Sequence, residues 1–101
     1  MSFARSALLI LAAVGASSTA FAADGAAVYN QNCAMCHAAG LANAPKLGDK
    51  AAWAARVKLG RDALVASAAK GKGAMPAKGG NPKLTDAEIE ASVDHMLASV
   101  Q

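Results

Sequence analysis

The segment Cys33-Ala34-Met35-Cys36-His37 restricts what this chain can fold into more than any other part of the sequence. It holds both cysteines of the chain and one of its two histidines within five consecutive positions. Three chemistries use a C-x-x-C pair: a redox-active disulfide, half of a zinc site, and the covalent attachment of a haem. Each needs different surroundings, so the rest of the sequence decides between them.

The first 22 residues have the regions of a secretory signal peptide in the right order. A single cation, Arg5, precedes an apolar run over residues 7–14, and small residues then close on Ala20-Phe21-Ala22. Because A-x-A is the usual cleavage pattern, the sequence predicts cleavage after Ala22 and a periplasmic location for one domain, residues 23–101. The alternative is an uncleaved anchor. A membrane span needs about 20 mostly apolar residues, however, and the hydroxyl residues that follow the apolar run count against one.

Residues 23–101 carry few large apolar side chains for a domain of their size. Much of the 54% hydrophobic content of the chain is alanine, and Tyr29 and Trp53 are the only Phe, Tyr or Trp residues after the predicted cleavage point. So small a domain usually needs disulfides, a metal or a large cofactor for stability. Two cysteines three positions apart close too short a loop to stabilise a fold. The missing core volume therefore points to a bulky apolar prosthetic group.

Helix-start and helix-stop signals predict an all-α chain with three to five helices and irregular loops. Asp24 is placed to cap a first helix that runs into the cysteine segment, and Asp49 to cap a second helix over residues 50–59. Asp62 is placed to start a third helix over residues 63–70. No stretch shows the alternation of polar and apolar residues that is typical of a strand.

The last helix has the clearest signal. Thr85-Asp86-Ala87-Glu88 matches a capping box, in which the threonine and glutamate side chains each satisfy a backbone amide at the helix start. The segment before it, Lys70–Lys83, contains four glycines and two prolines, which predicts an irregular loop. An apolar stripe at helical spacing follows the capping box: Ile89, Val93, Met96, Leu97 and Val100.

These surroundings favour the haem among the three chemistries. A zinc site usually takes its four ligands from two separated pairs, and this chain has no second cysteine pair. A disulfide oxidoreductase places C-x-x-C near a βαβ pattern, which is absent here. In C-x-x-C-H the two thiols lie about one helical turn apart, so each can add to one haem vinyl group. The sequence therefore predicts one haem c per chain, attached to Cys33 and Cys36, with His37 as a ligand of the iron.

Four segments in sequence order resemble the class I c-type cytochromes, above all the small bacterial cytochrome c-five group. They are Cys33–His37, Pro45–Asp49, Gly73–Pro76 with Lys78–Gly80, and Leu84–Glu88. The resemblance covers essentially all of residues 23–101. It implies an all-α class I cytochrome c fold around one haem, with the first and last helices crossing.

The resemblance also implies roles for two further residues. Pro45 would pack on the proximal side of the haem and accept, through its carbonyl, a hydrogen bond from the far nitrogen of His37, which would orient the imidazole. Trp53 would lie beside the haem, near a propionate. From the sequence alone, Trp53 is equally the largest core residue of the second helix.

Two features depart from the c-five pattern. Many members have a second cysteine pair where this chain has Gly80-Asn81-Pro82-Lys83, and many have an aromatic residue where this chain has His95. The second departure predicts weaker aromatic packing between the terminal helices.

Met75 is the best candidate for the second axial ligand of the iron. It lies in the glycine-rich loop, between Gly73 and Pro76, and the family resemblance points to the same residue. The other candidates are poorly placed. Met35 lies between the two cysteines, and Met96 belongs to the apolar stripe. His95 is expected at the edge of that stripe or in solvent.

A haem with histidine and methionine ligands has no open iron site, and the thioether raises its reduction potential. The sequence therefore predicts an electron carrier rather than an enzyme. It would be a soluble periplasmic protein that carries single electrons between respiratory-chain or periplasmic redox partners. Two alternatives stay open: a haem subunit of a periplasmic oxidoreductase complex, and a haem ligand sensor, which would need Met75 to be displaced.

The charge pattern suggests where redox partners would dock. Lysines cluster around Met75 at positions Lys70, Lys72, Lys78 and Lys83, whereas the last helix carries Asp86, Glu88, Glu90 and Asp94. A basic ring near the haem edge would steer the protein toward an acidic patch on a partner. The alternative is that these lysines are simply solvated. Neither nucleic-acid binding nor, after cleavage, a membrane span is predicted.

Overall fold

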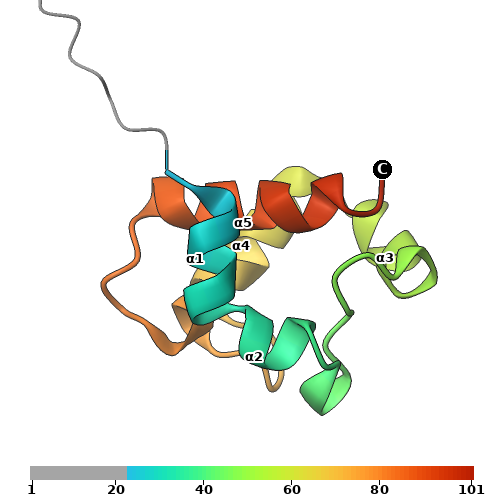
Figure 1. The fold of residues 1–101 in the computed structure, drawn as a ribbon, viewed down its shortest axis with the longest axis horizontal. Helices are drawn as coiled ribbons and strands as arrows, with labels where there is room; N and C mark the ends of the chain where they lie inside the picture. Colours follow the sequence, from blue (N-terminus) through green and yellow to red (C-terminus); the bar gives the residue numbers. More distant parts are fainter. Residues whose placement is uncertain (1–22) are drawn as a thin grey trace, which may run out of the picture.

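The computed structural model describes residues 23–101, and the predicted signal peptide, residues 1–22, lies outside the described residues. This part of the chain is helical and has no β-strand, which confirms the all-α prediction (Figure 1). The helices are α1 (Gly25–Asn32), α2 (Ala34–His37), α3 (Lys50–Val57), α4 (Arg61–Lys70) and α5 (Asp86–Ala98), with the short 3₁₀ turns η1 (Leu41–Asn43) and η2 (Ala77–Gly80).

Two of the predicted aspartate caps are present and the third is not. The carboxylates of Asp24 and Asp49 each accept a hydrogen bond from a backbone amide three residues on, at 3.1 Å, and so begin α1 and α3. The prediction that Asp62 starts the next helix is wrong, because α4 already begins at Arg61. Gly60, with φ of +90°, makes the turn that the helix start needs, and Asp62 lies in the first turn. A carboxylate there still interacts favourably with the helix dipole.

The capping box of α5 is confirmed. The Thr85 hydroxyl accepts a hydrogen bond from the Glu88 amide at 3.2 Å, and the Glu88 carboxylate accepts one from the Thr85 amide at 3.0 Å. The predicted apolar stripe faces the core: Ile89, Val93 and Met96 are buried, and Leu97 and Val100 are partly buried against the same core.

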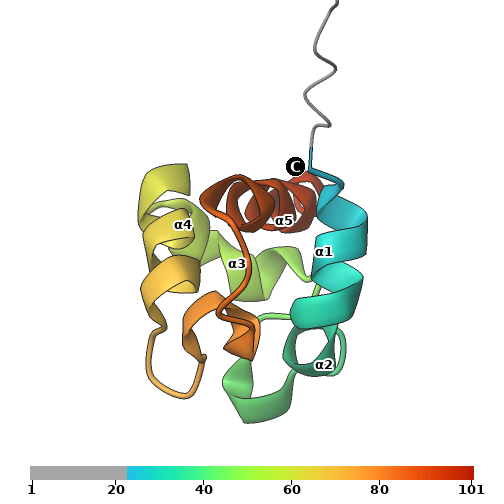
Figure 2. The same cartoon turned by 90° about the vertical axis from the view of Figure 1, so that its left-hand side faces the viewer.

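Helices α1 and α5 pack against each other and cross near the upper edge of the fold in both ribbon views (Figures 1 and 2). Tyr29 from α1 packs with Trp53 from α3 and with Val93 and Met96 from α5. The ring of His95 lies 5.2 Å from the ring of Tyr29, tilted by 48°. The imidazole therefore occupies the position for which weaker aromatic packing was predicted, and it keeps a ring contact between the terminal helices.

The predicted loop over residues 70–83 is irregular, apart from η2 and one isolated bridge. The bridge joins Lys72 and Met75 by two backbone hydrogen bonds of 3.0 Å. Gly79 has φ of +59°, and a Cβ there would lie 2.7 Å from the Asn32 carbonyl oxygen, so only glycine lets this loop approach α1 so closely. Within residues 23–101, no helix has the length and apolar character needed to cross a membrane.

Candidate haem site

The predicted site residues lie together around one hollow in the molecule. A cavity of ≈ 540 Å³ is lined by Cys33, Cys36, His37, Pro45 and Met75, among others. A smaller hollow of ≈ 80 Å³ shares His37, Pro45 and Met75 with it and adds Trp53. Cofactor sites in proteins measure about 300–1,000 Å³, so the larger cavity has the size of a cofactor site.

The turn of α2 places both thiols at this cavity. Cys33 separates α1 from α2, and its carbonyl accepts hydrogen bonds from the amides of Cys36 at 3.3 Å and His37 at 3.0 Å. The two cysteines, both half-buried, therefore occupy a single helical turn beside the imidazole. Met35 lies between them at the rim of the cavity and is 82% exposed.

The imidazole of His37 is buried and its orientation is defined. Its Nδ1 lies 2.8 Å from the carbonyl oxygen of Pro45. A carbonyl can only accept a hydrogen bond, so Nδ1 must carry the proton and Nε2 keeps its lone pair. The expected hydrogen bond between His37 and Pro45 is thus present. Nε2 is the nitrogen left to bind a metal.

Trp53 is both a core residue and a neighbour of the site. It is 4% exposed, and its ring stacks on the His37 ring with the centroids 6.1 Å apart and the planes 23° apart. Its Nε1–H donates to the carbonyl of Lys46 at 2.8 Å. The indole N–H is therefore engaged by the backbone and is not free to bind a haem propionate.

The four other ligand candidates differ in where they lie. Met75 is half-buried and lines both hollows. Met96 also borders them, but it is buried in the core cluster with Tyr29, as its place in the apolar stripe predicts. His95 lines neither hollow and packs against Tyr29, and Met35 is exposed at the rim.

Two cations at the cavity were not identified as site residues by the sequence analysis. Arg56 and Lys72 line both hollows, and no aspartate or glutamate does so among the described residues. Arg56 is half-buried and donates to the carbonyl of Ala52 at 2.7 Å. A haem carries two carboxylates, and the positive charges of these two side chains are complementary to them. Arg56 follows Trp53 by three positions on α3, so the two side chains share a face of the helix. This spacing is the sequence signal that could have placed Arg56 at the site.

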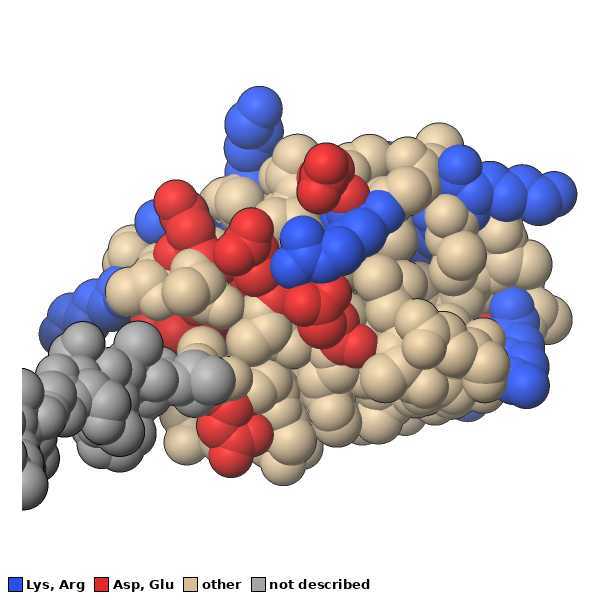
Figure 3. All heavy atoms as spheres, turned by 90° about the horizontal axis from the view of Figure 1, so that it is seen from above, with Lys and Arg blue, Asp and Glu red and all other residues tan. Residues whose placement is uncertain are grey.

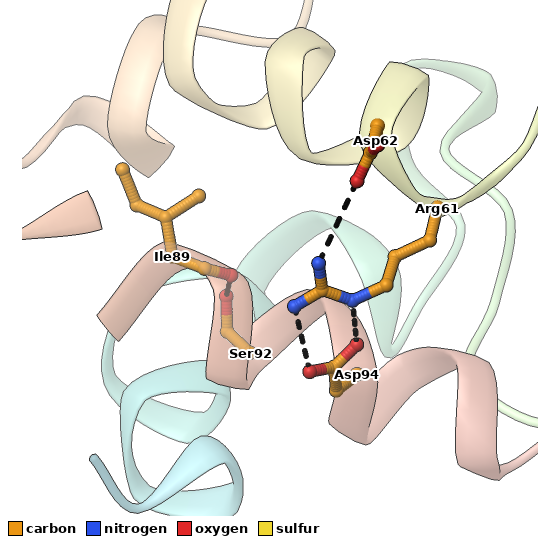
Figure 4. Close-up of polar contacts among 5 residues, drawn as sticks. All are labelled: Arg61, Asp62, Ile89, Ser92 and Asp94. Atoms are coloured by element: carbon orange, nitrogen blue, oxygen red, sulfur yellow. Dashed lines mark hydrogen bonds and ion pairs between the residues drawn. The ribbon is translucent and has the colours of Figure 1, made fainter. Parts of the chain in front are cut away.

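Ser92 is a second residue that sequence reasoning missed, because it lies among apolar neighbours on the buried face of α5. Its hydroxyl donates to the carbonyl of Ile89 at 2.8 Å (Figure 4). Burial raises the pKa of the Cys33 thiol, and a hydrogen bond with Ser92 partly offsets this. Ser92 therefore lies beside Cys33 in the cavity lining.

The donor set fits a haem better than a bare metal ion. Within residues 23–101, no three His, Cys, Asp or Glu side chains form a group that could hold a metal ion. The cavity instead offers two thiols on one helical turn, an imidazole with Nε2 available, a thioether and two cations. This combination matches the attachment, iron ligation and carboxylates of a haem.

Comparison with known proteins agrees with this site. Residues 20–96 match the family model described as cytochrome c oxidase, cbb3-type, subunit III. Cytochrome c-555 of Chlorobaculum tepidum is 50% identical over 99 residues, which cover 91% of this chain and 92% of that protein. Cytochrome c5 of Azotobacter vinelandii is 43% identical over 77 residues, covering 74% and 93% of the two chains. The chain therefore belongs to the class I c-type cytochromes.

A solved structure shows the same fold. The crystal structure of an electron transfer complex of nitrite reductase with cytochrome c contains a chain that matches with a TM-score of 0.74 and 47% identity. The match covers 77% of this chain and 95% of that one. Members of this family carry a covalently bound haem c, so haem c is the cofactor of this chain.

Proposed function

We propose that this protein is a periplasmic carrier of single electrons whose haem iron is bound by His37 and Met75. Cys33 and Cys36 form the thioether bonds to the haem. The observation that supports this most directly is that His37, with Nδ1 engaged by Pro45, and Met75 line the same cavity as both thiols. The bound haem supplies a one-electron change at iron. With His37 and Met75 both bound to the iron, no open site would remain, so the chemistry would be electron transfer rather than catalysis.

The residues that line the two hollows have separate roles in this proposal. His37 would hold the iron through Nε2 with its ring oriented by Pro45, and Met75 would hold it through its thioether, which would raise the potential. Trp53 packs on the imidazole, and the half-buried Arg56 would neutralise a haem carboxylate. Leu64 from α4 and Val93 from α5 line the smaller hollow together with His37 and Met75, and would keep water away from a haem held by those two residues.

Replacement of Met75 tests the ligand assignment. Met75→Ala should abolish the sulfur-to-iron absorption band of the oxidised protein, lower the reduction potential and allow carbon monoxide to bind the reduced protein. Met35→Ala is the matched control, because Met35 is a methionine at the cavity rim that is 82% exposed and should leave all three properties unchanged. An unchanged spectrum in Met75→Ala would reject the assignment. Tight carbon monoxide binding by the unmodified protein would instead favour the sensor.

A free carrier must also be distinguished from a haem subunit. The relative solved with nitrite reductase is described as part of an electron transfer complex, which supports an encounter between separate proteins. Size exclusion of a native periplasmic extract should show the haem absorbance at the size of the monomer. Elution of all the haem with a much larger complex would favour the subunit.

The proposed location rests on residues 1–22. We infer that they direct export and are removed after Ala22. The intact mass of the exported protein should correspond to a chain that begins at Ala23 and carries one haem. A mass that includes residues 1–22 would contradict this.

A further inference from the structure

The segment Pro45–Gly48 is held in place by four hydrogen bonds from three different helices. His37 Nδ1 donates to the Pro45 carbonyl at 2.8 Å, and the Leu47 amide donates back to the His37 carbonyl at 2.9 Å. The remaining two come from α3 and from the end of α5: Trp53 Nε1 donates to the Lys46 carbonyl at 2.8 Å, and the Gly48 amide donates to the Ser99 hydroxyl at 3.0 Å. Each of four successive residues is therefore tied to another element.

Trp53 is the central member of this arrangement. Its ring stacks on the face of His37, while its N–H holds the carbonyl next to the one that His37 uses. The Lys46 carbonyl and the Leu47 amide belong to one planar peptide group, which is therefore held by Trp53 and by the His37 carbonyl. The Pro45 carbonyl lies in the preceding peptide group, two rotatable bonds away, so fixing its neighbour restricts how far it turns from the imidazole. At 4% exposure, the indole is itself fixed by the core.

Ser99 extends the same arrangement to the end of the chain. It follows the last residue of α5, and its hydroxyl accepts from Gly48 across 51 positions of sequence. Gly48 has φ of +80°, a conformation that aims its amide without steric cost only for glycine. The segment that follows the acceptor Pro45 is thus tied to the end of α5 as well as to α3.

We propose that Trp53 and Ser99 are positioning residues for His37: they hold the Pro45 carbonyl against Nδ1 and thereby adjust the reduction potential. The inference rests on the proposed ligation of iron by His37. A hydrogen bond donated by Nδ1 makes the imidazole a stronger base, which stabilises ferric more than ferrous iron. Loosening the Pro45–Gly48 segment therefore raises the potential.

The test uses two variants of the haem-loaded protein, Trp53→Phe and Ser99→Ala. Each removes one hydrogen-bonding group that holds the segment and leaves His37 and Pro45 intact. The decisive readout is the solvent exchange rate of the His37 Nδ1 proton, measured by NMR in the reduced, diamagnetic protein. Loss of one such hydrogen bond should speed exchange about fivefold, and the potential should rise in the same variants.

Leu47→Ala is the matched control. Its side chain is 36% exposed and lines neither hollow, and its backbone keeps its hydrogen bond, so both readouts should stay at the wild-type value.

Wild-type exchange rates in both Trp53→Phe and Ser99→Ala would overturn the inference, even if the potential moved, because a packing effect would then explain the shift. If Trp53→Phe does not fold, Ser99→Ala alone decides. The absorption spectrum of Met75→Ala tests the proposed ligation independently, so failure of one does not imply failure of the other.

Discussion

Gly25 and Ala91 touch where α1 crosses α5. A methyl group at Gly25 would lie 2.2 Å from the carbonyl oxygen of Ala91 and 3.2 Å from the Cβ of His95. No side chain fits in that space, so the separation of the two helices depends on glycine at this position. The ring contact between Tyr29 and His95 lies at the same crossing.

Gly25→Ala should therefore destabilise the protein. Although alanine favours a helix, the contact is with backbone that cannot move aside, and overpacking costs about 1–3 kcal/mol. Urea unfolding of the oxidised protein, followed by tryptophan fluorescence, measures the change. Asn30→Ala, at an exposed position of α1 that lines neither hollow, is the control and should stay within about 0.5 kcal/mol of wild type. Equal stability of Gly25→Ala and wild type would show that the helices can separate freely.

Arg56→Gln should lower the reduction potential. It removes a half-buried positive charge from the cavity lining, which favours the more positive ferric state. It also removes a partner of the haem carboxylates, so their pKa should rise and the potential should become pH-dependent near neutrality. Lys58→Gln is the control, since Lys58 is exposed and lines neither hollow. Redox titration at several pH values measures both effects. Equal shifts of the reduction potential in Arg56→Gln and Lys58→Gln would contradict the proposed role of Arg56 beside the haem carboxylates.

The lysines around Met75 should steer partner association. Lys72 and Lys78 lie in the loop of the proposed iron ligand, whereas the acidic side chains gather on the face that carries α5 (Figure 3). Because patch asymmetry directs docking, Lys72→Glu and Lys78→Glu should slow second-order electron transfer to a partner at low salt. Rising ionic strength should slow the wild type and shrink this difference.

The control for steering is Lys50→Glu, at the start of α3 and outside that loop. It makes the same change in net charge and should have a much smaller effect on the rate. A flat salt dependence, with all three variants at the wild-type rate, would mean that the lysines only solvate the loop.

The ion pair between Arg61 and Asp94 should make stability depend on acid pH. The guanidinium donates to both carboxylate oxygens, at 2.6 and 3.0 Å, and joins α4 to α5 (Figure 4). This hydrogen bond holds the pKa of Asp94 below its ordinary value of 3.8. The pair therefore stabilises the fold above the unfolded-state pKa, and the effect is lost as the pH falls through the lower pKa of the folded state.

Asp94→Asn should accordingly be less stable than wild type at pH 7 and equal to it in strong acid. The difference should be small, because both side chains are about half exposed, at 43% and 51%. Glu90→Gln, on the same helix, is the control for a loss of charge without this hydrogen bond. Free energies of unfolding measured from pH 7 to pH 2 would refute the assignment if the Asp94→Asn difference did not change with pH.

Local signals were enough to predict much of this protein. The C-x-x-C-H segment needs only one helical turn to bring two thiols and an imidazole together. Its chemistry can therefore be predicted from five consecutive residues. The same holds for the caps at Asp24, Asp49 and Thr85, whose partners lie three positions away. The Asp62 prediction failed because a positive-φ glycine, Gly60, precedes a helix that begins at Arg61, two residues before the predicted start.

The sequence by itself therefore determined the cofactor, the helical class, and the residues that are candidates for its attachment and for the iron. Only the tertiary structure decided what surrounds them. In the folded chain the indole N–H of Trp53 donates to the Lys46 carbonyl, and the Gly48 amide donates to the Ser99 hydroxyl. Arg56 lies in the lining of the cavity. The physical reason is the separation along the sequence between the residues that make each contact. A cap or a C-x-x-C turn is completed within one turn of helix, whereas these contacts exist only after α3 and α5 have packed around the same hollow.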